Sequence, residues 1–150
     1  MTYSYRQLTG SDVSLFRELL KVFGEVFDEQ DTYQDKAPSD VYLAALLGKE
    51  HFIVLVAQHE EGIVGGLAAY VLEKFEQERK EIYIYDMAVL QDHRRRGIAT
   101  ELIQKLRQIG EERGAYVIFV QADKGDIAAI NLYESLGVRE EVYHFDITVN

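Results

Sequence analysis

Three stretches in the middle of this chain are apolar and rich in β-branched or aromatic residues, and only a few residues separate each from the next: 51–58, 63–75 and 80–90. Such side chains favour strands, and the connections are too short to hold a crossover helix. Three consecutive strands joined in this way must pair as antiparallel hairpins. We therefore expect an antiparallel sheet at the centre of the fold.

Helical spacing of apolar residues is found on both sides of these strands. A first helix is expected from Asp12 to Phe27, with Ser11 or Asp12 as its N-cap, and a polar loop at 28–40 follows it. The remaining predicted elements are a strand at 3–8, a helix from Ser39 to Leu47, a helix at 98–112, a strand at 115–122, a helix at 125–137 and a final strand at 141–149.

This order of elements restricts the architecture. The later β-α-β units add parallel pairing to the antiparallel hairpins, and no linker or repeat interrupts the chain. We expect one domain over residues 1–150. Its predicted class is α/β (α+β), with a mixed, mostly antiparallel central sheet and helices on both faces.

Composition excludes several classes of function. With 16 Lys and Arg against 26 Asp and Glu, the net charge is −10, so nucleic acid is not an expected partner. A cationic partner suits this charge, although solubility alone also explains an acidic chain. Cysteine is absent and the four histidines lack metal-ligand spacing, so we expect no metal.

Apolar stretches and cysteine content also indicate where in the cell the protein is found. The longest apolar stretch, 63–72, is too short to span a bilayer, so no membrane partner is expected. The first ten residues contain no apolar core of a secretory signal. Together with the absence of cysteine, this predicts a cytoplasmic protein.

A cluster of arginines stands out in this acidic sequence. Arg94, Arg95 and Arg96 precede Gly97 in the turn between the strand at 80–90 and the helix at 98–112. Free N–H groups and the helix dipole make a helix N-terminus a site for anions, and Gly97 allows a ligand close to the backbone. A pyrophosphate would fit such a turn, whereas the alternative is a solvated basic cluster that offsets nearby acids. Dinucleotide and P-loop signatures are absent, so a different cofactor is indicated.

The arrangement of this turn, R-x-x-G-x-A, and of a later helix, A-x-x-L-Y-x-x-L-G at 129–137, resembles the GNAT superfamily of N-acetyltransferases. The resemblance implies that the turn holds the pyrophosphate of acetyl-CoA and that Tyr133 lies beside the thioester sulfur. It also implies that the pantetheine arm pairs with the strand like an added strand. The cofactor-binding residues it implies are Met87, Ala88, Val89, Arg94, Arg95, Arg96, Gly97, Ile98, Ala99, Thr100, Asp126, Ala129 and Tyr133. Asp126 departs from the asparagine that many members carry.

A narrower resemblance is found at 75–89, 93–100, 114–126 and 136–147, which are similar to the aminoglycoside 3-N-acetyltransferases. It implies transfer of an acetyl group from acetyl-CoA to the 3-amino group of these antibiotics, with resistance as the result, and a homodimer. Residues 1–50 share this resemblance less distinctly. Because the chain has no cysteine to carry an acetyl group, we expect direct attack in a ternary complex.

Two residues are expected to carry the chemistry. Strict alternation along the strand places Asp86 beside Ile82, Ile84 and Ala88, where an unpaired carboxylate is costly. We interpret Asp86 as a general base or an anchor for the amine; the alternative is a buried aspartate paired with an arginine. Tyr133 is expected to protonate the departing thiolate, unless it is only a core tyrosine.

Further acids are expected around the acceptor. Asp31, Asp123, Glu141 and Asp146 are predicted to bind the cationic substrate together with Asp86, although each acid alone is typical of a solvated surface. His144 could line the mouth of the site with Asp146. Two other functions stay open: acetylation of a polyamine or another small cationic amine, and a noncatalytic regulator that binds acyl-CoA.

Overall fold

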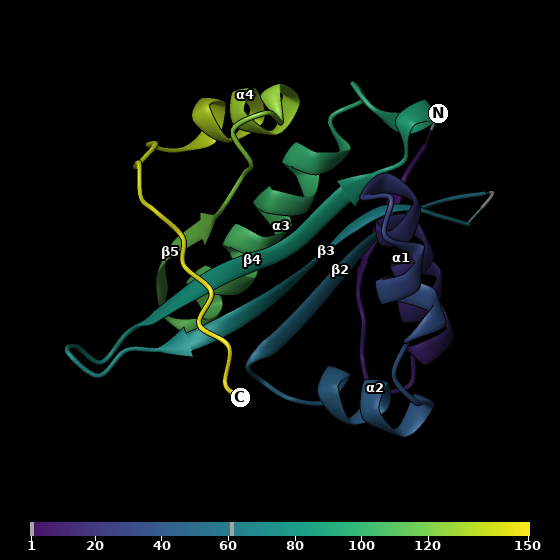
Figure 1. Ribbon diagram of the computed structural model, residues 1–150, viewed down its shortest axis with the longest axis horizontal. Coiled ribbons are helices and arrows are strands. Elements are labelled where there is room, and N and C mark those ends of the chain that lie inside the picture. Colours follow the sequence, from purple (N-terminus) through teal and green to yellow (C-terminus); the bar gives the residue numbers. More distant parts are fainter. Residues whose placement is uncertain (1, 61) are drawn as a thin grey trace.

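The computed structural model describes residues 2–60 and 62–150, so Met1 and Glu61 lie outside the described residues. Its sheet has five strands in the order β1-β2-β3-β4-β5 (Figure 1). The first four pair antiparallel with their neighbours, and β5 pairs parallel with β4. The strands are β1 (Ser4–Gln7), β2 (Phe52–His59), β3 (Gly62–Glu73), β4 (Lys80–Val89) and β5 (Ala115–Val120). The mixed, mostly antiparallel sheet expected from the sequence is thus confirmed.

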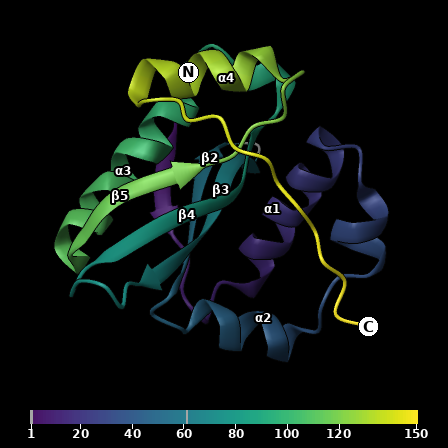
Figure 2. The same cartoon turned by 60° about the vertical axis from the view of Figure 1, so that its left-hand side comes forward.

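Helices cover both faces of the sheet, as predicted. On one face α1 (Val13–Val26) and α2 (Asp40–Leu47) pack on an apolar cluster that includes Val54, Val56 and Ala68. On the other face α3 (Ile98–Arg113) covers a second cluster, with α4 (Ile127–Leu136) beside it (Figures 1 and 2). Two short helical turns, η1 (Asp31–Asp35) and η2 (Gln91–His93), lie between the longer elements.

Close contact between α1 and the sheet depends on a glycine. A Cβ atom at Gly66 would lie 2.7 Å from Leu19 Cδ1 and 2.6 Å from the Leu55 oxygen. The absence of a side chain at Gly66 therefore lets the buried Leu19 of α1 rest directly on β3.

Asp12 is the N-cap residue of α1, as expected, but its side chain makes no capping bond to the helix. Its carboxylate accepts instead from the Thr9 backbone N–H at 2.7 Å and from Arg6 at 2.7 Å. Asp12 thus stabilises the turn that connects β1 to α1.

The final predicted strand is wrong for this structure. Residues 138–150, which we call the C-terminal segment, form neither strand nor helix and are exposed throughout. An alternating sequence forms a strand only when it pairs with an edge, and within the described residues no ladder joins this segment to any of the five strands. Within the described residues no helix is long and apolar enough to cross a membrane.

Candidate functional site

A gap opens in the sheet between β4 and β5. The ladder between these strands ends at Ile84 and Val120, whereas β4 stays paired with β3 as far as Val89. Figure 2 shows the two strands separating toward their C-terminal ends. Met87, Ala88 and Val89 therefore lie on a stretch of β4 that has lost its neighbour on one side, a place where an extended ligand can pair with the backbone.

The arginine turn follows this stretch immediately. Gly97 is the N-cap of α3 with φ of 78°, and Arg95 also has a positive φ of 61°. The N–H groups of Ile98, Ala99 and Thr100, the first residues of α3, have no acceptor within the helix and lie at the positive end of its dipole. A group that carries a pyrophosphate and an extended arm thus fits the turn and the gap together.

Arg94 has a structural contact that the sequence did not reveal. Its Nε donates to the Val89 carbonyl oxygen at 3.0 Å. The side chain thereby fixes the end of β4 to the turn, with the remaining guanidinium nitrogens on an exposed surface.

Asp86 lies on the opposite face of the sheet from the one that alternation predicts. β4 is bulged beside Ala68 and Ala69, which pair with Asp86 and Ile84, so that Tyr85 is an extra residue. Ile84 belongs to the apolar cluster under α3, whereas Ala68 and Ala88 belong to the cluster under α1. A bulge places two consecutive side chains on one face. Asp86 is consequently half-buried on the α1 side, away from Ile82 and Ile84.

The partner of Asp86 is a tyrosine, not an arginine. Tyr33 donates its hydroxyl to Asp86 Oδ2 at 2.8 Å. Tyr33 belongs to η1, a π-helical turn in the segment expected to be an irregular loop. Its ring packs against Phe23 and Phe27 at the end of α1. The only sign in the sequence was that Tyr33 is the one aromatic residue within the polar stretch 28–40.

The surroundings of Asp86 raise the pKa of its carboxyl above the ordinary value. Burial is the main cause, the hydrogen bond from Tyr33 opposes it, and the negative charge of Glu29 adds to it. Burial, the hydrogen bond to Asp86 and the negative charges of Asp86 and Glu29 all raise the pKa of the Tyr33 hydroxyl, so that this group remains a donor at neutral pH. A carboxylate with a raised pKa is a stronger base than an exposed one.

Tyr133 lies on α4, where its ring packs half-buried against the cluster under α3. Burial and the charge of Asp126 raise the pKa of Tyr133 to about 12. Asp126 itself caps α4 by accepting from the Ala129 N–H at 3.2 Å. Tyr133 is therefore a protonated donor over the physiological pH range.

The other predicted acids do not converge on Asp86. Asp31 is exposed on η1 and pairs with Lys36 at 3.2 Å, and Asp123 is exposed after β5. Glu141 pairs with Arg139 at 2.9 Å and Asp146 with His144 at 2.8 Å, both on the exposed C-terminal segment. The acid that does influence Asp86 is Glu29.

An open aromatic surface adjoins Asp86. On the α1 side α1 contacts β3 and β4 but leaves the β5 edge uncovered (Figure 1). Tyr83 stacks on Phe119 with ring centroids 4.7 Å apart, and Tyr85 meets both Tyr83 and Tyr70 edge-on. We call Tyr70, Tyr83, Tyr85 and Phe119 the aromatic surface.

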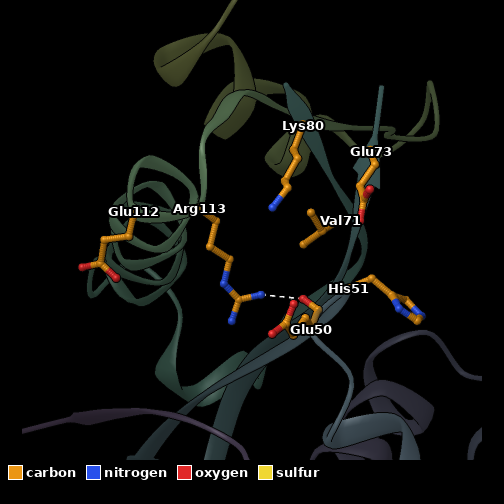
Figure 3. Close-up of a pocket in the computed structure, with 7 residues that line it drawn as sticks. All are labelled: Glu50, His51, Val71, Glu73, Lys80, Glu112 and Arg113. Atoms are coloured by element: carbon orange, nitrogen blue, oxygen red, sulfur yellow. Dashed lines mark hydrogen bonds between the residues drawn. The ribbon is translucent and has the colours of Figure 1, made fainter. Parts of the chain in front are cut away.

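A pocket of about 360 Å³ lies at the other end of the sheet, where β2 and β4 begin (Figure 3). Acidic and basic side chains mix there, and Arg113 donates to the Glu50 carbonyl oxygen. None of the residues predicted to bind cofactor or substrate or to take part in catalysis lines this pocket. The candidate site therefore remains at Asp86 and the arginine turn. No group of three or more potential metal ligands occurs in residues 2–60 and 62–150.

A family model described as "Acetyltransferase (GNAT) family" matches residues 14–138, which include the gap, the turn and α4. The chain belongs to the GNAT acetyltransferase family. Members of this family use acetyl-CoA, in agreement with the fit of the gap and turn to a pyrophosphate with an extended arm.

Two solved structures of aminoglycoside acetyltransferases are similar to this chain over nearly its whole length. An aminoglycoside acetyltransferase from an uncultured soil metagenomic sample is 55% identical over 100% of both chains, with a TM-score of 0.98. A second such enzyme from a soil sample, solved with sisomicin, is 36% identical over 99% of this chain and 97% of that one, with a TM-score of 0.91. Among curated proteins, human N-acetyltransferase 8B is 27% identical over 57% of this chain. That match spans only 37% of the human protein.

Proposed function

We propose that this GNAT acetyltransferase transfers the acetyl group of acetyl-CoA to the 3-amino group of aminoglycoside antibiotics and so confers resistance. The proposal depends above all on one observation: the half-buried carboxylate of Asp86 lies at the start of the unpaired stretch of β4. The acceptor class is supported by the two soil aminoglycoside acetyltransferases, which match essentially the whole chain.

Each part of the site has a role in this proposal. Backbone groups of Met87, Ala88 and Val89 bind the extended arm, and the arginine turn with the α3 N-terminus binds the pyrophosphate. Acetyl-CoA supplies the activated acetyl group. An N–H on the same stretch of β4 polarises the acetyl carbonyl, because a preorganised donor stabilises the charge that develops there.

Two side chains move protons. Asp86 takes a proton from the acceptor ammonium, because an amine attacks only when neutral. Tyr133 gives a proton to the departing thiolate, as its high pKa keeps it protonated. Attack is direct, in a ternary complex, since the chain has no cysteine to accept the acetyl group.

The aromatic surface suits an aminosugar acceptor. Aromatic rings pack against the apolar face of a sugar and attract ammonium groups. Tyr83 and Tyr85 lie on the same face as Asp86, and Glu29 adds negative charge beside it. We propose Tyr83, Tyr85 and Glu29, together with Asp86, as the acceptor wall.

A thiol-release assay with acetyl-CoA tests the function, and NMR of the purified product locates the acetyl group. Aminoglycoside-dependent CoA release with acetylation at the 3-amino group is expected. Acetylation at another amine would contradict the regiospecificity alone. Release with polyamines only would favour the small-amine alternative, and binding of acetyl-CoA without turnover would favour a regulator.

Asp86→Asn tests the proposed base. Turnover should fall by roughly 10²–10⁴-fold, the usual contribution of a positioned base, while acetyl-CoA affinity stays the same. Because burial raises the pKa of Asp86, its ionisation opposes folding as the pH rises from the ordinary aspartate value through the raised one. The asparagine variant should therefore be at least as stable as wild type at pH 7 by thermal unfolding. Wild-type turnover with an unchanged acid limb would exclude Asp86 as the base.

A further inference from the structure

The arginine turn is exposed along its length and anchored in the interior at both ends. Residues 94–97 are all exposed, whereas His93 before them and Ile98 after them are buried, with exposed fractions of 9% and 2%. A Cβ atom added at Gly97 would meet no atom within 4 Å, so the turn has open space around it there. Support from the interior therefore reaches the turn at His93 and Ile98.

The turn needs such support because its backbone is strained. Arg95 has a φ of 61°, in the left-handed region that a residue with a side chain adopts only where its surroundings hold it. Gly97 follows with a φ of 78°. The conformation that suits a pyrophosphate is thus not the one that residues 94–97 would favour by themselves.

The two anchors differ in chemistry. Ile98 packs in the apolar cluster under α3. His93 is polar, and with Asp12 it makes up the buried polar or charged side chains of residues 2–60 and 62–150. A buried imidazole is costly unless it forms a hydrogen bond. His93 forms one of 2.9 Å between its Nδ1 atom and the Tyr3 hydroxyl. This bond is directional, so it fixes the imidazole more narrowly than packing alone would.

Tyr3 brings a distant part of the chain to the turn. Ser4 of β1 pairs with Gln58 of β2, and this register places Tyr3 beside His59. The ring centroid of His59 lies 5.6 Å from that of Tyr3 and 5.8 Å from that of His93, and Tyr3 meets His93 edge-on at 5.7 Å. Figure 1 shows the chain just before β1 next to the turn that follows β4. The three rings therefore connect the ends of β1 and β2 to the start of the arginine turn.

We propose that His93 is a positioning residue for the cofactor: its hydrogen bond to Tyr3 holds the arginine turn, before acetyl-CoA arrives, in the conformation that binds the pyrophosphate. This inference rests on the proposed cofactor site in the turn and not on the identity of the acceptor. A protein whose binding conformation is populated only part of the time binds its ligand more weakly in proportion. Loss of the bond should therefore weaken acetyl-CoA binding and leave kcat at saturating acetyl-CoA unchanged.

His93→Phe and His93→Asn separate the hydrogen bond from the shape of the ring. Phenylalanine keeps a ring and loses Nδ1, whereas asparagine loses the ring and keeps a polar atom at the position of Nδ1. Calorimetry should show the Kd for CoA raised roughly three- to tenfold in His93→Phe, the scale of one hydrogen bond, and largely restored in His93→Asn. Unchanged affinity in His93→Phe, or an equal loss in both variants, would overturn the proposal.

Tyr3→Phe removes the other half of the bond and keeps the ring. It should weaken CoA binding as His93→Phe does, and the double variant should be no weaker than either single one, because both lose the same interaction. Tyr5→Phe is the matched control. Tyr5 lies two residues further along, packs against the same α3 cluster and holds its ring near Lys105, and its substitution should leave CoA affinity unchanged. Losses that add in the double variant would contradict a shared role.

Hydrogen exchange tests whether the turn is held in advance. The amides of 95–99 should exchange faster in His93→Phe than in wild type without ligand, and at the same rate when CoA is saturating. Equal rates without ligand would contradict the proposal.

Gly97→Ala distinguishes failure of this inference from failure of the cofactor site. If Gly97→Ala weakens CoA binding and neither His93→Phe nor Tyr3→Phe does, the inference is wrong and the site in the turn stands. If none of the three changes the affinity, CoA binds elsewhere and both are wrong. Calorimetry with CoA needs no acceptor, so these outcomes do not depend on whether the protein acetylates aminoglycosides.

Discussion

At the scale of single residues, the tyrosine contact on Asp86 connects the fold to the chemistry. Tyr33 binds Asp86 Oδ2 from a helical turn more than fifty positions away in sequence. Its hydrogen bond stabilises the charged carboxylate and so opposes the rise in pKa that burial causes. In our proposal Tyr33 is a positioning residue that tunes Asp86 without touching the acetyl group.

Tyr33→Phe removes this hydrogen bond and keeps the ring that packs on Phe23 and Phe27. The pKa of Asp86 should rise further, because the interaction that lowers it is lost. The acid limb of the pH profile of kcat/KM should accordingly move to higher pH, with activity partly recovered as the pH is raised.

Tyr83→Phe is the matched control. It removes the hydroxyl that donates to Gln121 at 3.1 Å on the same surface, and it should leave the acid limb in place. A limb that does not move in Tyr33→Phe would show that this contact is only structural.

Tyr133→Phe removes a hydroxyl that forms no hydrogen bond with the described residues. Thermal stability should therefore change little, whereas turnover should fall if the departing thiolate needs this proton. The loss should be constant from pH 6 to 9, because the pKa of Tyr133 is raised to about 12. Turnover equal to that of wild type would leave Tyr133 as a packing residue.

At the scale of elements, the ends of α3 provide an internal comparison. Gly97 begins the helix with φ of 78° and Gly114 follows it with φ of 81°, and neither has a neighbouring atom within 4 Å of an added Cβ. Steric space is thus equal at both ends, and only the backbone conformation resists a side chain. The left-handed region costs about 1–2 kcal/mol for a residue with a side chain.

Gly97→Ala and Gly114→Ala should therefore destabilise the protein by similar amounts, on the order of 1 kcal/mol each, in chemical denaturation. Their kinetics should differ. Gly97→Ala should raise the KM for acetyl-CoA severalfold, since the turn at Gly97 is the proposed pyrophosphate site, and Gly114→Ala should not. Equal acetyl-CoA KM values in the two variants would place the cofactor elsewhere.

At the scale of the whole molecule, the charge of −10 acts on any cationic acceptor. An acidic protein attracts ammonium groups over about the Debye length, and salt screens that attraction. The logarithm of kcat/KM for the acceptor should fall as ionic strength rises, with a slope that steepens with the number of ammonium groups on the aminoglycoside. Steady-state kinetics on acceptors with different numbers of amines measures this. Slopes that are independent of acceptor charge would mean that binding depends on local contacts alone.

The sequence by itself determined the features that depend on local pattern, namely the helices, most of the strands and the arginine turn. Apolar periodicity located the helices and the first five strands, and the R-x-x-G-x-A turn predicted where the cofactor would bind. These features are set by residues close together in the chain, because a helix terminus forms from its own backbone groups. Hence the family could be predicted before any contact between elements was known.

Only the tertiary structure decided the surroundings of Asp86, on the proposed acceptor side, and the conformation of the C-terminal segment. A bulge between β3 and β4 moved Asp86 to the α1 face, and Tyr33 came to it from a segment with no periodic signal. The alternating residues 141–149 formed no strand, although their pattern was correct. In each case the outcome depends on pairing with a distant edge or element, and hydrogen bonds between strands are satisfied only when that partner is present.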